Sequence, residues 1–457
     1  MNYQNVTIAA ISTAQGEGGI GVIRISGDRA IEIADNVFKN INGKKLAGMK
    51  GYTAAYGSII YENEKLDECV ALVFRAPHSY TGENVVELSC HGGVYITRQV
   101  LRAVLEAGAQ PAEAGEFTKR AFLNGKLDLT EAESVMDIIS AKSRSAARSA
   151  LSVKEGALRK KINEVKDGLL SVTAHLSAWA DYPEEDIAEV TDEMIFSACD
   201  KAVAALEHLL STYDMGQAVK QGIDTVIAGR PNVGKSSLMN LLSGYEKSIV
   251  TDIPGTTRDV VEDTVLVGDV LLRLSDTAGL RETDDAVEKI GVDRARQRLD
   301  QCGLLLAVFD NSRELDGDDF ELLDLAARIP SIAIINKTDL ETKLDIAQVR
   351  EKVRNIIYIS AAKGEGREAI VGAVEKIAGT DKLNPSEGIL SNERQRANVR
   401  NALASVREAR EALASGMTFD AVTVSLEDTI SELLEMTGEK TGDEVIDRVF
   451  HNFCVGK

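Results

Sequence analysis

The chain has 457 residues, a formal net charge of −20 at pH 7, 44% hydrophobic residues and 27% charged residues. This length predicts about three domains, and the composition is typical of a folded globular protein. No apolar run approaches the roughly 20 residues of a membrane-spanning helix. The acidic balance disfavours nucleic acid as a partner, except at a local basic patch.

The N-terminus and the cysteines bear on the compartment. The opening residues "MNYQNVTIAAIST" lack the basic segment of a secretory signal, so we expect a cytoplasmic protein. The five cysteines form no C-x-x-C pair, which disfavours both a disulfide framework and a zinc site.

Residues 1–118 alternate short apolar runs with turn residues, the pattern of an α+β domain. We expect five strands with two helices between them. The strand-like runs are "TIAAIST", "GIGVIRISG", "YGSIIYE", "CVALVF" and "NVVELSC".

After this domain the spacing of apolar residues changes to that of helices. From Leu127 apolar residues recur at helical spacing, so residues 119–215 are expected to be helices. Helical patterning returns at Arg394, and residues 381–457 are expected to pack on the earlier helices as the second part of one domain.

Three pairs of residues have the spacing of a capping box, in which the first residue caps a helix and the second bonds back to it. They are Thr130 with Glu133, Ser425 with Asp428, and Thr441 with Glu444.

Residues 216–380 lie between the two helical parts. Apolar runs such as "IDTVIAG", "VLLRLSD", "GLLLAVFD", "SIAIIN" and "NIIYISA" are separated by helical stretches. This pattern predicts β-α units on a mostly parallel sheet.

The segment "GRPNVGKS" matches the P-loop pattern G-x-x-x-x-G-K-[ST] between a predicted strand and a predicted helix. Gly229 and Gly234 let backbone N–H groups close on phosphates. Lys235 reaches the β- and γ-phosphates, and the Ser236 hydroxyl is a ligand for Mg²⁺. A glycine-rich turn that matches by accident fits this context poorly.

Two further motifs follow predicted strands. In "DTAG", Asp276 can reach the Mg²⁺ shell and the Gly279 N–H can meet the γ-phosphate. In "NKTD", Asp339 offers a carboxylate to the N1–H and the amino group of guanine, a donor pair that adenine lacks. Ser360 opens "SAAK", which is expected to bring a backbone N–H to the guanine O6. The nucleotide is therefore GTP.

The segment "TDIPGTTRD" has the position of a first switch loop, in which Thr257 binds Mg²⁺ when the γ-phosphate orders the loop. Leu280 follows DTAG where the commonest GTPases carry a water-orienting glutamine, and leucine cannot orient water. Glu288 is a candidate for that role, or else a solvated helix charge. A cation held by Asn232 and first-switch carbonyls could supply the charge of an arginine finger.

The motifs together define the expected GTP contacts. They are Asn232, Val233, Gly234, Lys235, Ser236, Ser237, Thr251, Asp252, Ile253, Pro254, Gly255, Thr256, Thr257, Asp276, Thr277, Ala278, Gly279, Asn336, Lys337, Thr338, Asp339, Ser360, Ala361 and Ala362. The predicted fold is multidomain: an α+β N-terminal domain (1–118), an all-α helical domain (119–215 and 381–457) and an inserted α/β P-loop GTPase domain of the Ras-like class (216–380).

Beyond these GTPase signatures the chain carries "GGIGVIRISG", "HGG", "GEFTKRAFLNGKLDL" and a terminal "FCVGK". The combination closely resembles the MnmE/TrmE family of tRNA-modification GTPases, nearly from end to end. The first, helical and terminal motifs make the resemblance specific, because GTPase signatures alone are widely shared.

The resemblance implies a homodimeric enzyme that forms a heterotetramer with the FAD-dependent partner MnmG (GidA). Such enzymes place an aminomethyl or carboxymethylaminomethyl group on C5 of the wobble uridine, U34, of certain tRNAs. The one-carbon donor is 5,10-methylene-tetrahydrofolate, for which 5-formyl-tetrahydrofolate is an analogue.

The resemblance also implies roles for individual residues. The N-terminal domain dimerises and binds folate through Arg24, Glu87, Lys126 and Lys457. K⁺ is held by Asn232, Thr251, Ile253 and Thr256, Mg²⁺ by Ser236 and Thr257, and Glu288 matches the water-orienting carboxylate.

Cys454 lies three residues from the end of the sequence and has three interpretations. It is a small buried hydrophobe after the last helix, or a prenylation signal, which Gly456 and Lys457 do not suit. By resemblance it is a catalytic thiol carried to the folate and uridine chemistry, as nucleophile, acid or positioning group.

Basic runs stand out against the acidic total: "KSRSAARS", "LRKK" and "RQRANVRNALASVREAR". They are solvated helix faces or contacts to tRNA phosphates. A competing function is an RNA- or ribosome-associated GTPase switch without small-molecule chemistry, and folate binding separates the two.

Overall fold

The computed structural model describes residues 6–181, 190–244, 263–274, 302–380, 384, 387–451 and 453–457. The chain divides into two compact units. One comprises Met1–Met136, Ile162–Ile195 and Ala404–Lys457, and the other comprises Asp137–Lys161 and Phe196–Leu403. Within the described ranges no helix combines the length and the hydropathy needed to cross a bilayer.

The first unit contains a seven-stranded sheet in the order β3-β4-β5-β6-β2-β1-β7. Neighbouring strands are antiparallel except for β1 and β7, which are parallel. The strands are β1 (Ile8–Ile11), β2 (Gly21–Ser26), β3 (Phe38–Asn40), β4 (Thr53–Tyr61), β5 (Glu64–Phe74), β6 (Val85–Cys90) and β7 (Gln110–Pro111). All five predicted strands are confirmed, and the short strands β3 and β7 were missed.

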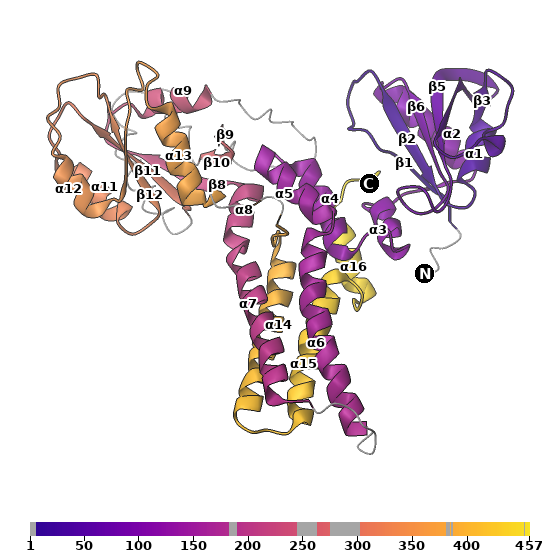
Figure 1. Ribbon diagram of the computed structural model, residues 1–457. Coiled ribbons are helices and arrows are strands. Elements are labelled where there is room, and N and C mark those ends of the chain that lie inside the picture. Colours follow the sequence, from indigo (N-terminus) through magenta and orange to yellow (C-terminus); the bar gives the residue numbers. More distant parts are fainter. Residues whose placement is uncertain are drawn as a thin grey trace. The chain divides into compact units, whose positions relative to one another are not determined.

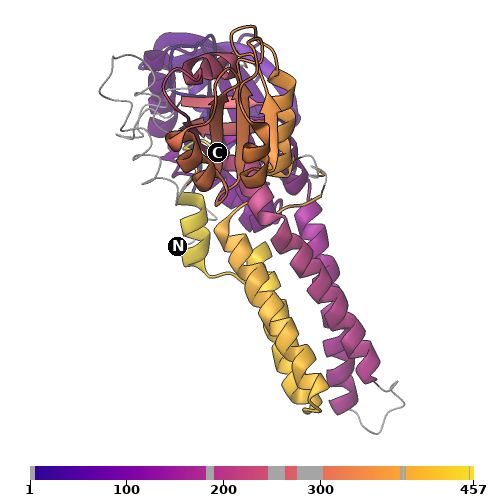
Figure 2. The same ribbon diagram turned by 90° about the vertical axis from the view of Figure 1, so that its left-hand side faces the viewer.

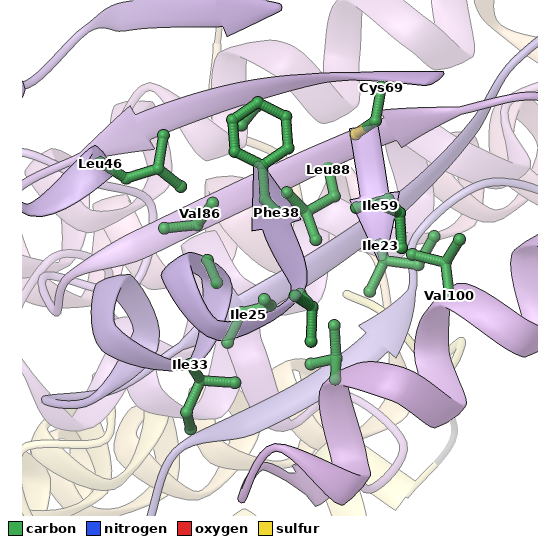
Figure 3. Packing of buried hydrophobic residues seen from close by; sticks show 14 of the residues in the cluster. Ile23, Ile25, Ile33, Phe38, Leu46, Ile59, Cys69, Val86, Leu88 and Val100 are labelled. Carbon is green, nitrogen blue, oxygen red and sulfur yellow. The ribbon is translucent and has the colours of Figure 1, made fainter. Parts of the chain in front are cut away.

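One face of this sheet packs on two helices, α1 (Ala30–Val37) and α2 (Val94–Glu106). Alternation along β5 sets the face, because Cys69, Ala71 and Val73 are buried whereas Val70 is exposed. Figure 3 shows the resulting cluster of buried residues, with Ile33 of α1 and Val100 of α2 on the helical side. A short 3₁₀ turn at Leu46–Gly48 adds the buried Leu46 to this cluster.

Helices complete the first unit. They are α3 (Glu116–Leu123), α4 (Leu129–Ser140), α6 (Ala157–Asp181), α14 (Glu393–Ala414), α15 (Phe419–Thr437) and α16 (Asp443–His451), of which α4, α6 and α14 continue into the second unit. Lys166 of α6 donates to Glu439, just after α15, at 3.0 Å. The C-terminal part of α14 runs beside α15 (Figures 1 and 2). A helix from before the inserted segment thus contacts residues from after it, and the single helical domain made of both parts stays a prediction.

The capping pair predicted at Thr130 and Glu133 is wrong. Asp128 caps α4 instead, since its Oδ1 accepts from the Glu131 amide at 2.7 Å and the Asp128 amide donates to Glu131 at 2.9 Å. Thr130 donates to the same Asp128 oxygen at 2.8 Å. The sequence holds two overlapping pairs with the same spacing, and the earlier one starts the helix.

The other two capping pairs are also wrong. Ser425 is buried inside α15, where its carbonyl accepts from the Thr429 hydroxyl at 2.8 Å. The Thr441 hydroxyl donates back to the Glu435 carbonyl at 2.9 Å, and α16 begins only at Asp443. Capping residues are also common inside helices and turns, so spacing alone did not locate the helix starts.

The second unit contains a six-stranded sheet in the order β13-β12-β11-β8-β10-β9. All neighbours are parallel except β9 and β10, which confirms the mostly parallel prediction. The strands are β8 (Ile223–Ala228), β9 (Asp263–Val267), β10 (Val270–Leu274), β11 (Leu304–Asp310), β12 (Ser331–Asn336) and β13 (Asn355–Tyr358). The edge strand β9 was missed.

Buried residues line both faces of this sheet, as expected for parallel strands flanked by helices. The helices of this unit are α5 (Arg144–Lys154), α7 (Asp192–Ser211), which begins in the first unit, α8 (Tyr213–Gln221), α9 (Lys235–Ser243), α11 (Gly317–Ala326), α12 (Ile346–Lys352) and α13 (Arg367–Ala378). The turn between β9 and β10 meets the start of α5, where the Asp269 carboxylate accepts from the Arg144 amide at 3.1 Å.

Candidate functional site

The P-loop follows β8 and leads into α9. Gly234, with a φ of +97°, is the residue before the helix, and a Cβ built there would lie 2.2 Å from Nδ2 of Asn336. Only glycine fits so close an approach. The Lys235 ammonium donates to the carbonyls of Gly229 and Arg230, each at 2.8 Å. The loop therefore joins a lysine to a helix N-terminus, an arrangement that favours anions.

Asn336 ties three predicted motifs together. It ends β12 and is buried, and its Nδ2 donates to the Val233 carbonyl of the P-loop at 2.8 Å. Its Oδ1 accepts from the Ala361 amide at 3.0 Å. The asparagine of the NKTD motif thus fixes the P-loop and the SAAK segment in one site.

Lys337 holds the P-loop from the same motif. Its ammonium donates to the Asn232 carbonyl at 2.7 Å and to the Asp310 carboxylate at 2.6 Å. Burial acts to raise the pKa of Asp310, but hydrogen bonds from Lys337 and Ser312 outweigh it and lower the pKa. Asp310 was missed by sequence reasoning, although a carboxylate at the end of the apolar strand β11 was a usable signal.

Asp339 is set to recognise a base. The Ser360 hydroxyl donates to its Oδ1 at 2.8 Å and is the first cause of a lowered pKa for this carboxyl. Thr338 anchors the loop by donating its hydroxyl to the Ile359 carbonyl at 3.0 Å. An ionised, oriented carboxylate is a pure acceptor, which suits the paired N–H donors of guanine.

Other predicted GTP contacts divide into two groups. Ser236 and Ser237 are exposed in the first turn of α9, and Ala362 is exposed after Ala361. The remaining predicted residues lie outside the described residues: Thr251, Asp252, Ile253, Pro254, Gly255, Thr256, Thr257, Asp276, Thr277, Ala278, Gly279 and Glu288.

A second constellation lies in the first unit, on the sheet face opposite α1 and α2. Arg24 of β2 stands directly across from Glu87 of β6 in the strand register. Its Nε donates to Oε1 of Glu87 at 2.9 Å, and its guanidinium lies 5.5 Å from the ring centres of Tyr80 and Phe117. Both side chains are largely buried, so this ion pair is held in one geometry.

The C-terminal residues reach this ion pair. Two aromatic side chains hold the C-terminal segment: Phe450 and Phe453 are buried against α4, and their ring centres lie 5.1 Å apart. Beyond them Val455 pairs with Ala114 as an isolated antiparallel bridge. The Phe residues therefore pack as predicted, and the last residues continue onto the sheet domain.

Gly456 makes the closest contact of the tail. Its carbonyl accepts from the Ser12 hydroxyl at 3.1 Å and from Nη1 of Arg24 at 3.3 Å. Its φ is +98°, and a Cβ there would lie 2.3 Å from the Ile11 carbonyl oxygen. Lys457 then places its ammonium 6.0 Å from the Tyr80 ring centre.

Cys454 is exposed, so its interpretation as a small buried hydrophobe is wrong. Its carbonyl, not its thiol, holds the tail, by accepting from the Gly115 amide at 3.4 Å. The neighbouring Phe453 is buried instead.

Lys126 follows α3, and its ammonium donates at 3.2 Å to the carbonyl of Pro77, on the loop between β5 and β6 that carries Tyr80. Of the four predicted folate contacts, Arg24, Glu87 and Lys457 therefore lie together near Tyr80, and Lys126 contacts Pro77 of the loop that carries Tyr80. Ser12, Tyr80 and Gly456 were missed, because no local pattern links the two ends of a chain.

The P-loop, the NKTD loop and the SAAK segment on a mostly parallel sheet define a GTP-binding protein of the P-loop class. Comparison with known proteins agrees. The pattern of the MnmE helical domain matches residues 129–454, and that of the GTP-binding protein TrmE N-terminus matches residues 7–126.

Whole-chain relatives extend the match. The tRNA modification GTPase MnmE of Lactococcus lactis subsp. cremoris (strain SK11) is 44% identical over 453 residues, which cover 99% of this chain and 98% of that protein. The protein of the same name from Carboxydothermus hydrogenoformans is 43% identical over 457 residues, with 99% of both chains covered. The one from Clostridioides difficile is 40% identical over 454 residues, again with 99% of both covered.

Among solved structures, the G domain of the T. maritima FeoB iron transporter is 25% identical and is covered over 98% of its length. It covers 34% of this chain with a TM-score of 0.25, too low to carry an argument. The sequence matches are decisive: this chain belongs to the MnmE family of tRNA modification GTPases.

We predict that Asp339→Asn changes the base that the nucleotide site accepts. The amide cannot accept both guanine N–H groups, so GTP affinity should fall roughly a hundredfold. The amide can donate to the 2-carbonyl of xanthine, so XTP should bind better than GTP. Equilibrium titration with labelled nucleotides measures both. Glu341→Gln, an exposed acid nearby, is the control and should keep GTP preference; unchanged GTP affinity in Asp339→Asn would refute the assignment.

We predict that Gly456→Ala releases the tail. A non-glycine residue in this backbone region is strained by about 1–2 kcal/mol, and the Cβ also meets the Ile11 carbonyl. Carboxypeptidase B should therefore remove Lys457 about tenfold faster, as followed by mass spectrometry. Gly416→Ala shares a positive φ of +72° but meets nothing within 4 Å, and should leave the rate unchanged. Equal rates for Gly456→Ala and wild type would contradict the seated tail.

Proposed function

We propose that this chain is a GTP-hydrolysing tRNA modification enzyme that works with the flavoprotein MnmG. Together they add an aminomethyl or carboxymethylaminomethyl group to C5 of the wobble uridine, U34. When bound, 5,10-methylene-tetrahydrofolate supplies the one-carbon unit. The observation that carries the proposal is the contact of the C-terminal Gly456 with Arg24 of the Arg24–Glu87 pair, because it holds the segment with the exposed Cys454 against the N-terminal domain.

The residues around Tyr80 fit a folate chemically. A folate carries carboxylates at one end and a pterin with N–H donors at the other. Arg24, Lys126 and Lys457 offer cations to the first, and Glu87 offers a carboxylate to the second. Both contacts from Arg24 go to Oε1 of Glu87, which keeps the carboxylate oriented. Cys454 would act on the one-carbon unit or the uridine from the tail.

In the GTP site, Lys235 binds the β- and γ-phosphates and stabilises the charge that develops on them. The exposed Ser236 hydroxyl in the first turn of α9 is a hard oxygen donor suited to Mg²⁺, with Thr257 and Asp276 as further contributors. Water attacks the γ-phosphorus, the bond to the β–γ bridging oxygen breaks, and GDP and phosphate leave. We assign the orientation of that water to Glu288.

A potassium ion fits the same site. Asn232 is an exposed P-loop residue with a φ of +62°, and its backbone is fixed by Lys337. Its amide oxygen, with Thr251, Ile253 and Thr256 of the first switch segment, would hold K⁺. The charge of that ion would take the place of an arginine finger.

A homodimer is supported by the open face of the N-terminal sheet. Tyr56 of β4 is 48% exposed and Val70 of β5 is 42% exposed, on the side away from α1 and α2. Exposed large side chains on a sheet face are typical of an interaction surface. We assign this face to a second copy of the chain, and a heterotetramer to the complex with MnmG.

Nucleoside mass spectrometry of tRNA tests the proposed function. Cells without this protein should lack the modified wobble uridine, and the wild-type gene should restore it. Cys454→Ser should fail to restore it while GTP turnover of the purified variant stays normal, because the thiol lies outside the nucleotide site. Unchanged nucleosides in cells without the protein would overturn the proposal. Normal modification by Cys454→Ser would overturn the role of the thiol.

We predict that GTP turnover is faster in K⁺ than in Na⁺ at equal ionic strength, and that Asn232→Ala removes the difference. The smaller ion suits the carbonyl cage less well, so the expected ratio for wild type is roughly tenfold or more. Phosphate release measures the rates. Asn42→Ala, an exposed asparagine of the N-terminal domain, should keep the K⁺ preference. Equal wild-type rates in both salts would sink the cation assignment.

A further inference from the structure

The strongest local charge in this acidic chain lies on α5 and the start of α6. Residues 141–161 contain seven lysines and arginines and one glutamate, a net +6, in a chain of net −20. Repulsion over most of the surface means that a polyanion can approach only where the local charge is reversed. This segment is such a place.

The charges face outward in the structure. Helix α5 buries Ser145, Ala146, Ser149, Ala150 and Val153. Arg144 and Arg148, four residues apart, are exposed on the opposite face, about 6 Å apart along the helix axis. Lys142 is exposed just before the helix, and Lys160 is exposed just after it on α6.

These cations make no ion pair with the described part of the chain. That holds for Lys142, Arg144, Arg148, Lys154 and Lys160, whereas Lys161 lies 3.8 Å from Glu387. The other basic run, on α14, differs, because Arg396 pairs with Glu393 at 3.4 Å and Arg394 is engaged with other groups. The structure therefore distinguishes the basic residues of α5 and its flanks from the run on α14, which the sequence left equivalent.

We propose that the outer face of α5, with Lys142 before it and Lys160 after it, is the surface that binds the phosphate backbone of tRNA. This inference rests on the proposed function. Arginine and lysine in an exposed row, with no ion pair to an acidic side chain among the described residues, suit regularly spaced phosphates. A lipid surface fits less well, because Leu151 is the only large exposed apolar side chain on the described face of α5 and an interfacial helix needs an apolar face.

The position of α5 favours a partner whose binding can affect the GTPase domain. The amide of Arg144 donates to Asp269, and the Ser145 hydroxyl donates to the Asp269 carbonyl at 3.3 Å. Asp269 lies in the turn between β9 and β10. An RNA strand along α5 would therefore lie against a helix that is bonded directly to the nucleotide-binding sheet.

The test is tRNA binding by the full-length protein, measured with transcribed tRNA at several salt concentrations. The triple variant K142A/R144A/R148A should bind about tenfold or more weakly near 0.1 M salt. The slope of log affinity against log salt should flatten by about 2, since each lost phosphate contact contributes roughly 0.7–0.9. Unchanged GTP turnover confirms that the variant is folded.

The control is R328A/K343A/R350A, which removes the same charge from three exposed positions elsewhere in the second unit. It should bind tRNA like wild type. An equal loss in both variants would mean a long-range charge effect and would overturn the proposal, as would wild-type affinity in the α5 variant. Loss of binding to anionic phospholipid vesicles, with tRNA binding intact, would also overturn it. Failure of the wild type to bind any tRNA would instead contradict the proposed function.

Discussion

The hydrogen bond from Arg24 to the Gly456 carbonyl joins groups 432 residues apart and closes the chain on itself. Arg24 is already held by Glu87 across the strands, so the tail meets a guanidinium that cannot turn away. Burial of Phe450 and Phe453 holds the C-terminal segment in place, because burying such side chains stabilises by about 1.5–3 kcal/mol each. The hydrogen bonds from Ser12 and Arg24 fix the orientation of the Gly456 carbonyl.

Much of the nucleotide site follows from local sequence. A P-loop, an NKTD loop and a SAAK segment each sit at the end of a predicted strand, and parallel strands bring those ends to one edge of the sheet. The bonds from Asn336 to Val233 and from Ala361 to Asn336 were not foreseen, but they link motifs that were. The residues expected to respond to the γ-phosphate, such as Thr257, Asp276 and Glu288, stay predictions because they lie outside the described residues.

The second constellation could not be derived from periodicity or spacing. Arg24 and Glu87 are ordinary strand charges until the register places them opposite each other, and register depends on long-range pairing. The sequence gives no sign that Gly456 has a fixed conformation. Its positive φ and the nearby Ile11 carbonyl nevertheless mean that only glycine fits at this position. The capping prediction at Thr130 and Glu133 failed for a local reason, because the pair Asp128 and Glu131 has the same spacing and overlaps it.

The central claim is that the last residues of the chain form part of the proposed site for the one-carbon donor. Calorimetry with 5-formyl-tetrahydrofolate tests it most directly, on the whole protein and on a version that ends at Val455. If Gly456 and Lys457 help to form the site, removing them should weaken binding at least about tenfold. Equal affinity with and without those residues would contradict the claim.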